Sequence, residues 1–123
     1  ILPDAGSVRL PHLLPKHLAR EVLYAGRRLT AADAERFGIV NRVVPAAELL
    51  TAATELAGRI VANAPLSVAA IMDIERSTAH LDPIEAMAFI KTLPSYRTAI
   101  DSEDATEGTA SFNEKRSPVW RGR

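Results

Sequence analysis

Apolar residues recur at helical spacing over most of the chain. The clearest case is residues 46–63, where apolar side chains follow a period of about 3.6 residues and the charged side chains fall outside the stripe. The same spacing predicts helices over residues 16–25, ending at Gly26, and over residues 67–80. The pattern therefore predicts a mainly α protein.

Capping residues mark the starts of two further helices. Thr30, with Asp33 three residues later, is typical of a helix N-terminus, and Gly38 is placed to stop that helix. Pro83 follows Asp82 at the start of another, where the first turn loses no hydrogen bond to proline. The local chemistry thus predicts where these helices begin.

Three other segments complete the pattern. In residues 41–45, NRVVP, two β-branched valines lie between Asn41 and Pro45, which predicts a short strand or an extended link. Pro94 is expected to kink or break the helix that begins near Asp82, and the acidic run 101–104 predicts a last helix over residues 103–116. Because only 5% of residues are aromatic, we expect these helices to pack closely around a large aliphatic core.

The composition narrows the classes of function. Fifteen basic residues balance fifteen acidic ones, so no overall charge attracts nucleic acid or an anionic membrane. The chain has no cysteine, and His12, His17 and His80 form no metal-binding pattern, which leaves them surface or packing roles. With no long apolar run or signal peptide, we expect a soluble, cytoplasmic protein without a metal or a membrane partner.

One alternative is a DNA-binding module. The segment LTAADAERFGIVNRVV has the look of a helix-turn-helix, with Gly38 in the turn. Pro45 leaves too short a recognition helix, and the balanced charge offers little attraction for phosphate. We therefore expect no nucleic-acid partner.

Three segments resemble, in order, the C-terminal part of the enoyl-CoA hydratase/isomerase (crotonase) superfamily. They are PDAGSVRLPHLLP, VLYAGRRLTAADAERFGIVNRVVP and EGTASFNEKRSPVW. The resemblance covers the whole chain and implies the mainly α, C-terminal helical trimerisation region of a crotonase-like α/β ββα-spiral fold. Residues 1–45 would be the end of the spiral core, and residues 46–123 the helical trimerisation region.

The resemblance implies an acyl-CoA enzyme of fatty acid metabolism, a lyase or isomerase. Such enzymes stabilise a thioester enolate during hydration or double-bond isomerisation. They use coenzyme A as part of the substrate, need no further cofactor, and assemble as trimers or hexamers. Their oxyanion hole and hydratase carboxylates lie before these segments, so we expect a C-terminal fragment that is inactive alone. The alternative is a non-catalytic helical assembly or interaction fragment.

Asp4 is a departure from the hydratases the chain resembles. They commonly have glycine at the matching position, whereas dienoyl-CoA isomerases and ring-epoxide isomerases have an aspartate that acts as an acid or base. The resemblance therefore makes Asp4 the candidate catalytic residue. The alternative is that Asp4 caps a helix that begins near Ala5. Gly6 is expected to allow close backbone approach rather than chemistry.

Phe112 and Lys115 are the candidate coenzyme A residues. Three positions apart on the last predicted helix, they share a face. The matching residues in the family lie on a neighbouring subunit and hold the adenine and 3′-phosphate of coenzyme A. The alternatives are a core phenylalanine and a solvated lysine. Arg116, Arg121 and Arg123 would either extend a basic rim for the phosphates or be exposed to solvent.

Two aromatic residues complete the candidates. Tyr96 faces either the acyl pocket, as residues of this region do in the family, or the core. Trp120 stands where the family usually has phenylalanine. We expect Trp120 to pack the C-terminal tail back against the body of the protein.

Overall fold

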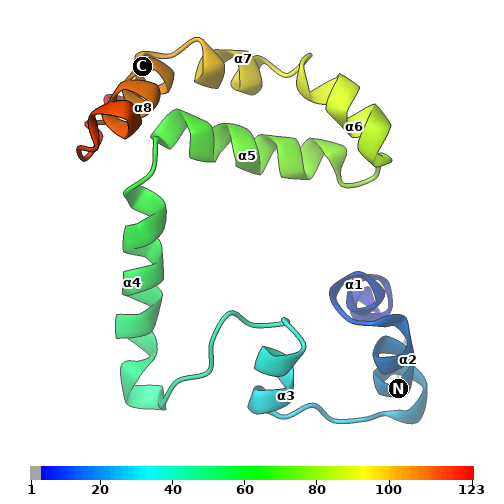
Figure 1. Cartoon of the computed structure of the whole chain (residues 1–123). Helices are drawn as coiled ribbons and strands as arrows, with labels where there is room; N and C mark the ends of the chain where they lie inside the picture. The colour runs from blue at the N-terminus through cyan, green and yellow to red at the C-terminus, as the bar shows by residue number, and fades with distance from the viewer. Residues whose placement is uncertain (1–3) are drawn as a thin grey trace. The chain divides into compact units, whose positions relative to one another are not determined.

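The structure is a computed structural model that describes residues 4–123 (Figure 1). These residues divide into two compact units, the first reaching Leu50 and the second running from Thr51 to Arg123. All the regular secondary structure in the described part of the chain is helical, as the sequence pattern predicts.

The first unit is built from three short helices. They are α1 (Ala5–Leu13), α2 (Lys16–Ala25) and α3 (Ala31–Arg36). Leu14, Leu18 and Ala19 are its buried apolar residues. Leu10, Leu29, Phe37 and Ile39 pack around them. The apolar stripe of α2 thus forms a small core with α1 and with the segment that contains α3.

The predicted helix ends of this unit are confirmed. Gly26 ends α2 with a φ of 68°, in the left-handed region that suits glycine. Thr30 and Asp33 form a complete capping box, in which the Asp33 N–H donates to Thr30 Oγ1 over 3.1 Å and the Thr30 N–H donates to Asp33 Oδ2 over 3.0 Å. The hydrogen bond from the Thr30 backbone lowers the pKa of Asp33 below its ordinary value.

The predicted strand at NRVVP does not form. Residues 41–45 link α3 to a 3₁₀ helix, η1 (Ala46–Glu48), which leads into α4 (Leu49–Val61). The extended-link interpretation therefore holds. The long amphipathic helix predicted over residues 46–63 is confirmed, with a tighter first turn.

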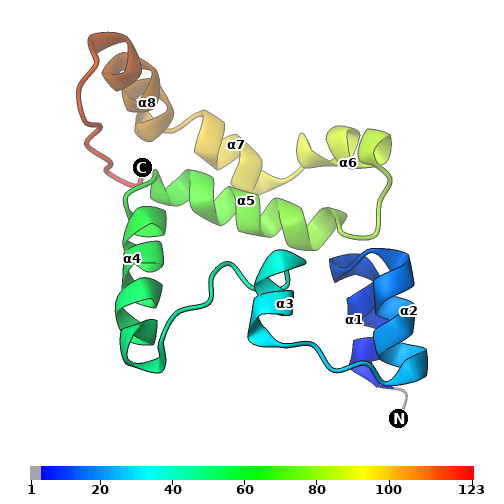
Figure 2. The ribbon, with the colours of Figure 1, turned by 60° about the horizontal axis from the view of Figure 1, so that its bottom comes forward.

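The rest of the second unit holds four helices. They are α5 (Pro65–Thr78), α6 (Pro83–Ile90), α7 (Pro94–Ile100) and α8 (Glu103–Glu114). Figures 1 and 2 both show α7 alongside α5, where Ser95 Oγ donates a hydrogen bond of 2.5 Å to Asp73 Oδ2. Asp82 caps α6 as predicted, and two backbone N–H groups lower the pKa of its carboxylate. Pro94 separates α6 from α7 and also occupies the first turn of α7.

The expected large aliphatic core is wrong. Among the described residues, the buried apolar side chains are Leu14, Leu18, Ala19, Ala70 and Ala99. Large apolar side chains instead stay exposed on α4, α5 and α6. The most exposed are Leu50 at 80%, Val61 at 81% and Ile84 at 84%. A helix buries only the stripe that faces its neighbour, so apolar positions outside that stripe stay in contact with solvent.

No single helix in residues 4–123 is long and apolar enough to cross a bilayer. The helical stretches Ala46–Val61 and Pro65–Thr78 meet the length and composition requirement together, across a bend of 103°.

Candidate functional site

Asp4 caps the first helix. Its exposed carboxylate accepts a hydrogen bond of 2.8 Å from the Gly6 N–H, and its carbonyl accepts one from the Ser7 N–H. A Cβ on residue 6 would lie 3.0 Å from Asp4 Oδ1, so glycine gives this cap its room. The capping interpretation is confirmed. The acid or base role of Asp4 stays a prediction.

Phe112 and Lys115 lie at the end of α8 in the second unit. Phe112 is 84% exposed, so its placement in the core is wrong. Lys115 is the C-cap, with a left-handed φ of 54°, and its N–H donates to the Phe112 carbonyl over 3.3 Å. The predicted helix to Arg116 therefore overshoots, and helical spacing does not relate these two residues. The chain reversal nevertheless keeps them in one turn, both exposed.

Arg116 is held by two carboxylates. Its Nη2 donates to Glu107 Oε2 over 2.8 Å, its Nη1 donates to Glu107 Oε1, and its Nε donates to Glu114 Oε2 over 2.6 Å. These bonds raise the pKa of Arg116. The guanidinium nitrogens that would bind a phosphate are thus already hydrogen-bonded to carboxylates. This argues against a role for Arg116 in a basic rim.

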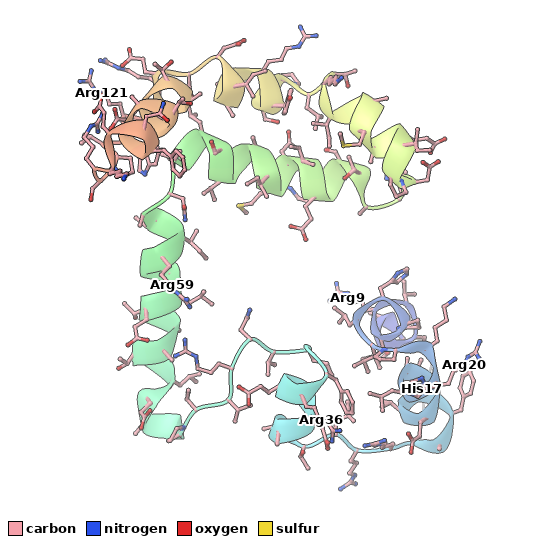
Figure 3. The ribbon with its side chains drawn as sticks, viewed as in Figure 1. Arg9, His17, Arg20, Arg36, Arg59 and Arg121 are labelled. Carbon is pink, nitrogen blue, oxygen red and sulfur yellow. The ribbon has the colours of Figure 1, made fainter. Side chains whose placement is uncertain are left out.

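The other two tail arginines lie beside an acidic residue. Nitrogen atoms of Arg121 and Arg123 lie 3.5 and 3.3 Å from carboxylate oxygens of Glu103, at the start of α8. Figure 3 shows the labelled side chain of Arg121 beside this helix. Both arginines are exposed, and their part in a basic rim stays a prediction.

Glu107 stays ionised to low pH. The hydrogen bonds from Arg116, followed by one of 2.8 Å from the Val119 N–H, lower the pKa of Glu107 from 4.5 to about 2. A depressed pKa in the folded state means that Glu107 contributes stability fully above its ordinary pKa. That contribution is lost as the pH falls through 4.5 toward 2.

Asp104 holds the C-terminal tail, which Figure 2 shows turning back from the end of α8. The Asp104 side chain is 2% exposed. Its Oδ1 accepts the Arg121 N–H over 2.7 Å and its Oδ2 accepts the Gly122 N–H over 2.9 Å. One residue earlier, the Glu103 N–H donates to the Arg123 carbonyl over 2.7 Å. The start of α8 therefore clasps the last residues of the chain.

Trp120 fastens the same tail to the α4–α5 junction. Its Nε1–H donates a hydrogen bond of 2.8 Å to the Ala62 carbonyl. Its ring lies over Gly108 of α8, where an added Cβ would be 3.6 Å from Cη2. The prediction that Trp120 packs the tail against the body is confirmed.

Sequence reasoning missed the roles of Asp104 and Glu107. The sequence predicts that Asp104 is a capping group or a negative charge in the first turn of a helix. In the structure Ser102 is the N-cap, and the Asp104 side chain binds the C-terminal tail instead. Glu107 and Arg116 are nine positions apart, beyond the spacings at which helical side chains meet. The only signal was their presence at the two ends of the segment EGTASFNEKR.

The roles of the remaining candidates, the three histidines and Tyr96, stay predictions. The described residues hold no cluster of three His, Cys, Asp or Glu suited to a metal ion. The three histidines are exposed, and Tyr96 is half-buried on α7. A groove of about 590 Å³ runs between α1 and α2. Its lining includes Ser7, Pro11, Lys16, Arg20, Leu23 and Tyr24. Figure 3 labels Arg20 and His17 on α2.

Comparison with known proteins agrees with the family resemblance of the three sequence segments. The family model for enoyl-CoA hydratase/isomerase matches residues 1–123. Carnitinyl-CoA dehydratases of Salmonella typhi and Escherichia coli are 47% identical over 126 residues, covering 100% of this chain and 48% of theirs. The chain thus spans about half the length of the curated relatives it matches.

Solved structures agree with the fold. Enoyl-CoA hydratase from Bacillus anthracis superposes with a TM-score of 0.85 at 34% identity, over 100% of this chain and 47% of that one. Enoyl-CoA hydratase from Mycobacterium tuberculosis gives a TM-score of 0.82 at 34% identity, over 96% and 46%. The helices described above are therefore those of the crotonase fold, and the chain belongs to the enoyl-CoA hydratase/isomerase family.

Proposed function

We propose that the protein acts on acyl-CoA thioesters, adding water to a 2-enoyl-CoA, removing it from a hydroxyacyl-CoA, or shifting a double bond. The observation that carries this proposal is the family match over the whole chain, with carnitinyl-CoA dehydratases at 47% identity. Since the chain spans about half of these relatives, the activity is proposed for the whole protein. From the resemblance we also propose that coenzyme A is part of the substrate and that no other cofactor takes part.

The proposed reaction passes through a thioester enolate. Removing a proton next to the carbonyl, or adding water at the β carbon, places negative charge on the thioester oxygen, which backbone N–H donors stabilise by several kcal/mol. A carboxylate then moves the proton. Asp4 is our candidate, because the Gly6 N–H holds one of its oxygens while the side chain stays exposed.

Phe112 and Lys115 are proposed to hold coenzyme A. A phenylalanine ring that is 84% exposed offers a flat face on which adenine can stack. Lys115 presents an ammonium in the same turn, suited to a phosphate as a point charge. Because Arg116 is engaged by Glu107 and Glu114, Lys115 is the cation of this turn that remains for the 3′-phosphate.

Binding of coenzyme A tests this site. We expect Lys115→Ala to weaken coenzyme A binding about tenfold, as for loss of one charged contact, and to leave 3′-dephospho-coenzyme A unaffected. Calorimetric titration of both ligands measures the ratio of their dissociation constants. Lys91→Ala is the matched control, since Lys91 is also an exposed helix C-cap of the second unit. Equal binding of the two ligands by the unsubstituted protein would contradict the proposed site.

The exposed apolar surface favours a second role, in assembly. Leu50, Val61 and Ile84 are each at least 80% exposed, and covering large apolar side chains by a partner removes them from water, which is favourable. We propose that copies of the protein cover them in a trimer or hexamer. Native mass spectrometry at micromolar concentration is expected to show multiples of three. A stable monomer that still binds coenzyme A would contradict assembly and leave the ligand site standing.

A further inference from the structure

The turn after α8 is fixed by one carboxylate. The Glu107 carboxylate accepts hydrogen bonds from both terminal nitrogens of Arg116 and from the Val119 N–H, so it holds the chain on either side of residues 117–118. The Glu107 side chain is only 21% exposed, and that of Arg116 is 40% exposed. We call this pair of parallel hydrogen bonds between Glu107 and Arg116 the fork. Two such bonds restrict the orientation of the arginine more than a single contact does.

This fork braces a strained residue. Lys115 has a φ of 54°, which is unfavourable for a residue with a side chain. Two hydrogen bonds hold the reversal from the helix side, from the Lys115 N–H to the Phe112 carbonyl and from the Arg116 N–H to the Ser111 carbonyl over 3.0 Å. The Glu107 fork holds it from the other side, through the residue next to Lys115.

We propose that Glu107 is a positioning residue for the coenzyme A site. It holds Arg116 so that Lys115 keeps its left-handed conformation and presents its ammonium in the same turn as the Phe112 ring. The inference rests on the proposed function, because it assigns to Glu107 the geometry of the ligand contacts proposed for Phe112 and Lys115.

The fork also separates the charges of two neighbouring basic residues. Arg116 lies between Glu107 and Glu114, so its positive charge is compensated within the turn. Lys115 is left as the cation for the ligand. Without Glu107, the Arg116 guanidinium would be released from its fork and the strained backbone of Lys115 would relax toward commoner conformations.

The test compares coenzyme A with 3′-dephospho-coenzyme A. We expect Glu107→Gln to weaken coenzyme A binding about fivefold, less than the loss of Lys115 itself, with dephospho-coenzyme A unchanged. In a Glu107→Gln/Lys115→Ala double variant the preference for the 3′-phosphate should fall no further than in Lys115→Ala. Glu103→Gln is the control, because Glu103 is an exposed acid on the same helix that also pairs with arginines.

A second variant separates positioning from folding. Arg116→Lys keeps the charge but cannot form the fork, so it should lower the same preference while the helical circular dichroism is retained. If Glu107→Gln and Arg116→Lys keep the full preference that Lys115→Ala loses, the inference is wrong and the proposed site stands. If the unsubstituted protein shows no preference, the proposed site is wrong and the inference is overturned with it.

Discussion

Asp104→Ala is expected to lower the free energy of unfolding of the C-terminal clasp by about 3 kcal/mol. The alanine removes a buried carboxylate that accepts two short hydrogen bonds, from the Arg121 and Gly122 N–H groups. Bonds to a charged acceptor are worth about 1.5–3 kcal/mol each. Once the tail is released, its N–H groups form hydrogen bonds with water. The decrease in the free energy of unfolding therefore cannot exceed the free energy that holds the tail against α8.

The single tryptophan of the chain reports this release. In Asp104→Ala, Trp120 fluorescence should shift to the red at lower urea than the helical circular dichroism is lost. Asp104→Asn keeps one acceptor and turns an amide donor toward a backbone N–H, so it should fall between alanine and the unsubstituted protein. Asp101→Ala changes an exposed acid nearby and should behave like the unsubstituted protein. Coincident, unshifted transitions in Asp104→Ala would contradict the clasp.

Local chemistry predicts much of this fold. The left-handed Gly26, the Thr30 capping box and the Asp82 cap each depend on residues within five positions of one another, so a short sequence segment contains the whole interaction. Periodicity places α2, α4 and α5 for a similar reason, because helical side chains three and four positions apart share a face.

The errors arise where nonlocal structure decides. The β-branched Val43 and Val44 have no neighbouring strand in the described part of the chain, so residues 41–45 remain an extended link. Large apolar side chains such as Val61 of α4 and Ile84 of α6 fit an aliphatic core by composition, yet they stay exposed in the second unit. Periodicity shows that a face is apolar, but it does not identify what covers that face.

The candidate site shows the same division. The sequence segment at the end of α8 directs attention to Phe112 and Lys115, but it does not show that Lys115 leaves the helix with a positive φ. The residues that follow Lys115 donate hydrogen bonds to Glu107, which lies eight positions before Lys115 in the chain. The Asp104 and Trp120 contacts span still longer separations, so periodicity carries no trace of them.

These contacts give the tail a role in the proposed site. The tail follows directly from the Lys115 reversal and is fixed at three places: by Glu107, by Asp104, and by the α4–α5 junction. A tail held only at Glu107 would leave the turn free to rotate about that point. Fixing it again at Trp120 and Asp104 makes the orientation of the turn a property of the whole second unit.

Trp120→Ala is therefore expected to lower the free energy of unfolding by about 2 kcal/mol, below the usual range for a fully buried tryptophan because this ring is half-buried. Trp120→Phe keeps the ring over Gly108 and loses the hydrogen bond to the Ala62 carbonyl, so it should cost about 1 kcal/mol. Urea unfolding followed by circular dichroism measures both, since neither variant retains tryptophan.

Gly108→Ala supplies the matched control for ring packing. An added Cβ would sit 3.6 Å from Trp120 Cη2, an ordinary contact, and alanine favours the helix over glycine by about 0.5–1 kcal/mol. The variant should be at least as stable as the unsubstituted protein. If Trp120→Phe were as unstable as Trp120→Ala, the indole hydrogen bond and not the ring contact would hold the tail. If Gly108→Ala were destabilised, the ring would lie closer to α8 than the structure places it.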